Sequence, residues 1–181
     1  MSLAFYCVLA PRGTRWPDDS EFNKAWAGLP MYERLVRPRL RFILRALEEH
    51  MRVTDGLTEP FDVPTRLEIE HVMPQAWEAN WPLPVGESLN GGMADHRREI
   101  IHSIGNLTLV TKKLNGTLSN APWSVDQSDV PCKRSTLEKY SLMMISKNII
   151  NQPNWNETQI SDRGDALFNE ARKIWPPPPS S

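Results

Sequence analysis

The chain has 181 residues, of which 40% are hydrophobic and 24% are charged, and this composition is typical of a folded globular protein rather than a disordered one. No apolar run approaches the ~18 residues that a transmembrane helix needs. The apolar stretch at residues 3–10 is too short for a secretory signal and follows no basic segment. We therefore expect a cytoplasmic protein without a membrane segment, in which Cys7 and Cys132 are free thiols.

The charge of the chain does not favour a nucleic-acid-binding protein. The formal net charge is -1, and residues 61–135 hold seven Lys or Arg against nine Asp or Glu. Nucleic-acid-binding domains usually present a basic surface. Affinity for DNA would have to come from locally clustered cations, from a metal ion or from another domain, and we favour another domain.

Residues 1–60 are predicted to form helices that pack on the core of the domain. A short helix begins at Asp18 or Asp19, either of which can cap it. Its apolar face carries Phe22, Ala25 and Trp26. A longer amphipathic helix is predicted over about 37–52, with Pro38 at its start. Its apolar face carries Leu40, Ile43, Leu44, Leu47 and Met51.

Residues 61–135 are predicted to contain two strands. Alternating apolar and polar residues over 66–72 indicate the first strand. A loop rich in Pro, Gly and Asn follows over 82–94, and then a helix that Asp95 caps and Gly105 ends.

The second strand is predicted over 106–110, and Thr111 can cap a short helix after it. One further helix is predicted over about 132–144. The last helix begins at Asn156, which with Gln159 resembles a capping box. Its apolar face carries Ile160, Leu167, Phe168, Ala171, Ile174 and Trp175.

The pair Glu70–His71 lies at the end of the first predicted strand, just before a proline turn. Hydrolysis of a phosphodiester needs an activated water and a divalent ion that neutralises charge on the phosphate. The Glu70 carboxylate can bind a hard cation, and the His71 imidazole can take a proton from water. Neighbours on a strand point to opposite sides, but we expect a twisting strand end to let both reach one site.

Three asparagines lie in the stretch that contains the second strand: Asn106, Asn115 and Asn120. An amide oxygen is a neutral ligand for Mg²⁺, and an asparagine can equally fix a loop through backbone hydrogen bonds. For Asn106 and Asn120, a structural role in a turn and a contact in the site are about equally expected, because asparagine favours turns. Four cations flank this stretch: Lys112, Lys113, Lys133 and Arg134. They could contact phosphate or lie on a solvated surface, and the sequence favours neither.

The other histidines and the tryptophans are interpreted as structural. His96 and His102 are predicted on a solvated helix face, and His50 on the surface. Core packing is expected for Trp26, Trp155 and Trp175. The interpretation stays open, between packing and base stacking, for Trp77, Trp81 and Trp123.

The segments EHVMPQ, GNLTLV and LNGTLSNAPW, with Lys133 downstream, resemble the signature of HNH (ββα-metal) nucleases. The sequence is most similar to the C-terminal domain of GmrSD-type modification-dependent restriction endonucleases, over roughly residues 15–176. That resemblance implies a DNA endonuclease of antiviral defence that uses Mg²⁺, or Mn²⁺ in its place. It also implies a ParB-like, nucleotide-using N-terminal domain that this chain does not contain.

By the same resemblance, His71 is the general base, Glu70 and Asn115 are metal ligands, and Asn106 orients the loop that carries the base. Lys133 or Arg134 would face the phosphate, and Asn120 is a further possible contact. No second histidine stands in the helix position of the signature, so Asn115 must serve there.

We therefore expect an α+β fold: a small ββα-metal HNH core at 61–135 between helices from 1–60 and 136–175, with a disordered tail at 176–181. Two alternatives stay open: a non-catalytic module that binds nucleic acid or a partner domain, and an RNase.

Overall fold

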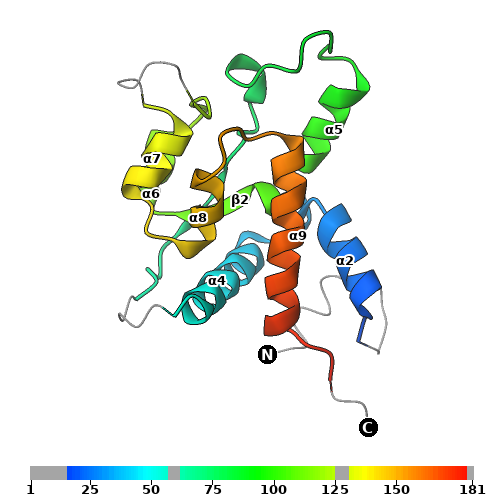
Figure 1. The fold of residues 1–181 in the computed structure, drawn as a ribbon, viewed down its shortest axis with the longest axis vertical. Helices are drawn as coiled ribbons and strands as arrows, with labels where there is room; N and C mark the ends of the chain where they lie inside the picture. Colours follow the sequence, from blue (N-terminus) through cyan, green and yellow to red (C-terminus); the bar gives the residue numbers. More distant parts are fainter. Residues whose placement is uncertain (1–15, 57–61, 125–130, 179–181) are drawn as a thin grey trace.

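The structure is a computed structural model that describes residues 16–56, 62–124 and 131–178. Two predictions fall wholly or partly outside the described residues: the free thiol of Cys7 and the disordered tail, of which residues 179–181 are not described. Within the described ranges, helices surround a small two-stranded sheet (Figure 1), so the predicted α+β class is confirmed. None of the described helices is long and apolar enough to cross a membrane.

The sheet consists of β1 (Glu68–His71) and β2 (Leu107–Val110), which pair antiparallel with His71 opposite Leu107. Both strands lie within the ranges that the sequence predicted. The sheet separates two apolar cores, because Leu109 packs with α4 and α9 whereas Val110 packs with the helices that follow β2. The end of β1 is therefore covered from both sides.

The N-terminal helices are α2 (Asp19–Gly28), α3 (Met31–Arg34) and α4 (Arg37–Thr54). Asp18 caps α2, since its side chain accepts a hydrogen bond from the backbone N of Glu21 at 2.8 Å and the Glu21 side chain returns one. The short helix α3 was not predicted. Helix α4 confirms the predicted amphipathic helix and buries Leu40, Ile43, Leu44 and Leu47.

The connection between the strands contains η1 (Trp77–Ala79), α5 (Gly92–Ile100) and η2 (Ile104–Asn106). The predicted cap at Asp95 is wrong, because α5 begins at Gly92 and the Asp95 carboxylate instead pairs with Arg98 at 2.8 Å. The predicted stop at Gly105 is also wrong, since the helix ends at Ile100 and Gly105 lies in η2.

Gly105 is required by close packing rather than by a helix end. A Cβ atom at this position would lie 2.0 Å from the carbonyl oxygen of Ile160 and 3.1 Å from the backbone nitrogen of Gly164. Both partners belong to α9 (Glu157–Ile174), the long helix that runs between α4 and α2 in Figure 1. Gly105 therefore lets α9 approach the start of β2.

Substitution Gly105→Ala should destabilise the fold by about 3 kcal/mol, because the new methyl group meets backbone that can move only with α9. Urea denaturation measures this, and Gly116→Ala is the control. A Cβ at Gly116 meets nothing within 4 Å, so that change should stabilise α6 (Lys112–Leu118) by up to ~1 kcal/mol. Equal midpoints for the two variants would contradict the packing argument.

Helix α6 follows β2 as predicted, and its cap Thr111 accepts from the backbone N of Leu114 at 3.3 Å. The single helix predicted over 132–144 is wrong, because the structure has α7 (Lys133–Tyr140) and a separate α8 (Met144–Ile150).

The cause of this break is Glu48, a buried carboxylate on α4. It accepts hydrogen bonds from the backbone N of Met144 at 3.0 Å and of Ile145 at 2.8 Å. These bonds satisfy amides that would otherwise be unpaired at a helix start, so a new helix begins there.

The last helix, α9, starts as predicted, with the Asn156 side chain accepting from the backbone N of Thr158 at 2.9 Å. The other half of the predicted capping box is wrong, because Oε1 of Gln159 has no hydrogen-bond partner among the described residues. The three tryptophans predicted in the core are buried, and so are the three whose role was left open: Trp77, Trp81 and Trp123.

Candidate functional site

His71 lies at the end of β1 with only 5% of its surface exposed. Its ring packs edge-on against the ring of Tyr32 on α3, with 4.2 Å between the centroids, and lies 5.4 Å from the ring of His102. Its Nε2 atom is buried and has no hydrogen-bond partner among the described residues. A ring nitrogen is thus left free beneath the α3 segment.

The surroundings of His71 keep its imidazole neutral. Burial, together with the smaller effects of the nearby charges of His102, Lys133 and Arg37, lowers its pKa to about 3. The ring is therefore neutral at pH 7, and one of its nitrogens carries no proton. This is the protonation state that a general base needs.

Asn106 fixes the turn that follows His71. Its side chain is fully buried and accepts hydrogen bonds from the backbone N of Met73 at 2.8 Å and from Nε1 of Trp155 at 3.1 Å. Its Nδ2 donates to the carbonyl oxygens of Met73 at 2.8 Å and Ile101 at 2.9 Å. Because both the oxygen and the nitrogen of this amide bond to groups within the protein, Asn106 positions the chain around His71 instead of contacting a ligand.

The side chain of Glu70 has a different partner from the side chain of His71. Lys133, at the start of α7 and fully buried, donates from Nζ to Oε1 of Glu70 and to the carbonyl oxygen of His71 at 2.7 Å. Burial raises the pKa of Glu70, and the Lys133 charge opposes that shift; burial also lowers the pKa of Lys133. Glu70 thus faces α7, whereas His71 faces α3, so the structure turns the two side chains to different elements and not, as predicted, to one shared site.

The predicted phosphate contacts at Lys133 and Arg134 are both engaged inside the protein. Lys133 is turned to Glu70, and Nε of Arg134 donates to the carbonyl oxygen of Ile150 at 2.9 Å. Lys112 and Lys113 are exposed at the start of α6. Among the four cations predicted near the asparagines, these two are therefore the ones that solvent reaches freely.

Asn115 and Asn120 have different surroundings. Helix α6 packs against β1, and Oδ1 of Asn115 is buried without a hydrogen-bond partner among the described residues. Asn120 is exposed, and its backbone carbonyl accepts from Nδ2 of Asn80 at 2.7 Å. An unpaired buried amide oxygen is costly unless a ligand completes it, which marks Asn115 as the better candidate ligand.

The described residues include no group of three or more His, Cys, Asp or Glu side chains that could hold a metal ion. Mg²⁺ needs fewer, since it commonly binds through one or two carboxylates and takes its other ligands from water and substrate phosphates. The Glu70 carboxylate and the unpaired Asn115 amide oxygen are ligand types that such an ion takes. The Lys133 ammonium is a cation that competes for the same carboxylate.

Three residues that lie beside His71 were not predicted to belong to the site: Tyr32, His102 and Arg37. The solvated position predicted for His102 is wrong, because its side chain is 13% exposed and Nε2 lies 3.4 Å from Oε1 of Glu33. Nothing in the sequence places α3 against the strand end. The sequence does show a cluster of arginines after Tyr32, and this cluster was the signal that could have drawn attention to the segment.

The other two histidines, His96 and His50, were both predicted to be exposed, and only the first prediction is confirmed. His96 is exposed, as predicted. The surface position predicted for His50 is wrong, because it is half-buried with Nε2 3.2 Å from Oε2 of Glu170.

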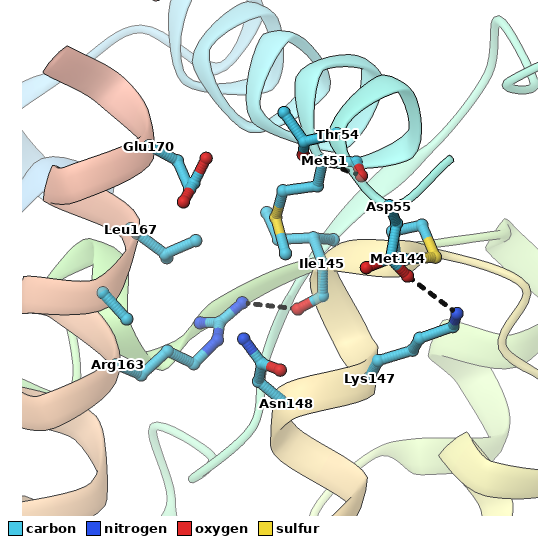
Figure 2. Close-up of a pocket in the computed structure, with 11 residues that line it drawn as sticks. Met51, Thr54, Asp55, Met144, Ile145, Lys147, Asn148, Arg163, Leu167 and Glu170 are labelled. Carbon is cyan, nitrogen blue, oxygen red and sulfur yellow. Dashed lines mark hydrogen bonds and ion pairs between the residues drawn. The ribbon is translucent and has the colours of Figure 1, made fainter. Parts of the chain in front are cut away.

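A pocket lies between α4, α8 and α9, and Figure 2 shows the residues that line it. The buried Arg163 borders it and donates to the carbonyl oxygens of Ile145, Gly105 and Leu107 at 3.0, 2.6 and 2.9 Å. The pocket is lined by none of the residues predicted to act in catalysis or metal binding. Arg163 therefore ties α8 to the start of β2.

The model of the C-terminal domain of GmrSD restriction endonucleases matches residues 16–170. No curated protein and no solved structure matches the chain.

Proposed function

Because the chain belongs to the family of GmrSD restriction endonuclease C-terminal domains, we propose that it is a metal-dependent HNH-type nuclease domain that hydrolyses DNA phosphodiester bonds. The observation that carries this proposal is the place of His71: its imidazole lies at the end of β1, and its buried Nε2 has no hydrogen-bond partner among the described residues. Recognition of base modification would belong to another domain, such as the ParB-like domain that the resemblance implies.

The reaction adds water across a P–O bond. His71 takes one proton from the attacking water as its oxygen bonds to phosphorus, the bond to the leaving oxygen breaks, and that oxygen gains a proton from solvent. Asn106 keeps the turn after β1 in place, so that the imidazole stays fixed during this transfer. A general base in this role contributes about 10²- to 10⁴-fold to the rate.

Glu70 and Asn115 are the residues that would hold the divalent ion, on β1 and on the helix that packs against it. When bound, such an ion neutralises charge that builds on the phosphate. The unpaired Oδ1 of Asn115 supports this assignment, and the Lys133–Glu70 ion pair implies that the ion competes with an internal cation.

Binding of Mn²⁺, followed by the loss of the free-ion signal in electron paramagnetic resonance, separates the nuclease from a non-catalytic module. We expect Glu70→Gln and Asn115→Ala each to weaken Mn²⁺ affinity by at least about tenfold. The matched controls are Glu68→Gln, on the same strand, and Asn120→Ala, at an exposed amide. If the unaltered chain bound DNA but no Mn²⁺, the binding-module alternative would replace this proposal.

A further inference from the structure

The junction between α3 and α4 carries a concentration of positive charge. Residues 32–41 contain four arginines and a single acidic residue, Glu33, which gives this stretch a net charge of +3 in a chain whose total is -1. We call the four arginines the arginine segment: Arg34, Arg37, Arg39 and Arg41. The rest of the chain is therefore acidic, and this junction differs from it.

The arginine segment is available to a ligand. Arg34, Arg37 and Arg39 are exposed and Arg41 is half-buried. Ion pairs between described residues involve other arginines, namely Arg45, Arg52, Arg97, Arg98 and Arg172. Helix α4 starts within the segment, with no acidic residue in its first turn and no side-chain cap, so its dipole adds to the positive potential.

The arginine segment lies beside His71. Tyr32 joins the two, because its ring contacts the His71 ring and its backbone N donates to the carbonyl oxygen of His102 at 3.1 Å. The Arg37 guanidinium stacks on the Tyr32 ring, 3.4 Å from its centroid, and donates to the Tyr32 carbonyl oxygen. Its charge reaches His71, where it is among the causes that lower the pKa of the imidazole.

We propose that the arginine segment binds the phosphate backbone of duplex DNA beside His71; this rests on the proposed nuclease function. Guanidinium groups bind phosphates through paired, charge-assisted hydrogen bonds, and exposed arginines release counterions from DNA when they do so. The segment supplies the clustered cations that an acidic core lacks. It also takes the phosphate contact that the buried Lys133 cannot make without leaving Glu70.

The test is DNA binding without cleavage. Fluorescence anisotropy of a labelled duplex of about 20 base pairs is measured in EDTA, at several salt concentrations. The arginine variant is Arg34→Gln/Arg37→Gln/Arg39→Gln. The control removes the same number of charges from exposed lysines on α7, α8 and α9, as Lys139→Gln/Lys147→Gln/Lys173→Gln.

We expect the arginine variant to bind at least about tenfold more weakly, and its salt dependence to fall by about 3 in log–log slope, since each phosphate contact contributes about 0.9. The control should retain most of its affinity. Arg34→Gln/Arg39→Gln, which keeps Arg37 on Tyr32, should show the same trend with unchanged thermal unfolding.

Equal losses in the two triple variants, or no loss in either, would overturn the inference. So would an unaltered chain that does not bind the duplex even at low salt. Nicking of plasmid DNA by the unaltered chain is scored separately, so the nuclease function can stand when this inference fails.

Discussion

Substitution His71→Ala should lower the rate of DNA nicking by about 10²- to 10⁴-fold, the contribution of a positioned general base. The imidazole is neutral and has a free buried nitrogen, so its removal leaves the attacking water without a proton acceptor. The rate is measured as conversion of supercoiled plasmid to the nicked form at saturating Mg²⁺.

The matched control is His96→Ala, which removes an exposed histidine on α5 and should leave the rate unchanged. Because the His71 ring packs against Tyr32, the variant could also lose stability. Thermal unfolding, Mn²⁺ binding and duplex binding should therefore be measured on His71→Gln, which keeps a polar side chain. A His71→Gln protein that folds, binds both ligands and still nicks at the original rate would remove His71 from the mechanism.

Substitution Lys133→Met should destabilise the fold by about 3–5 kcal/mol at neutral pH. The methionine replaces the lysine stem but leaves Glu70, which is 9% exposed, as a buried carboxylate without its cation. Lys139→Met, at an exposed position of the same helix, should change stability by less than about 0.5 kcal/mol. Urea denaturation of both variants gives the comparison.

The loss in Lys133→Met should depend on pH. Burial already raises the pKa of Glu70 above 4.5, and removal of Lys133 raises it further, so the folded variant holds a proton that the unfolded chain releases. The unfolded state then binds fewer protons, and stability falls as the pH rises above about 4.5.

The loss should consequently be small in acid and large at pH 8. The double variant Glu70→Gln/Lys133→Met should recover most of the stability at pH 8, because no buried charge is left. A loss that is the same at both pH values, or no recovery in the double variant, would show that Lys133 stabilises the fold through packing alone.

Local patterns were sufficient to predict the elements that depend on local residues. The cap at Asp18, the apolar stripe of α4 and the alternation around His71 each arise from side chains within a few positions of one another. The break between α7 and α8 depends on Glu48, which lies 96 residues before Met144 in the chain. No short window of sequence contains both Glu48 and Met144.

The same distinction applies to the candidate site. The placement of His71 at a strand end could be predicted, because a short motif carries it. The burial of Lys133 against Glu70 could not, since it depends on a contact between α7 and β1 across 63 residues of sequence. The position of the arginine segment likewise depends on the contact between Tyr32 and the end of β1.

The most direct test of the nuclease assignment is nicking of supercoiled plasmid, modified and unmodified, by the unaltered chain with Mg²⁺ or Mn²⁺ and with EDTA in their place. We predict conversion to the nicked or linear form with either ion and none in EDTA. An intact plasmid in every condition, with a folded protein that binds no Mn²⁺, would contradict a metal-dependent nuclease.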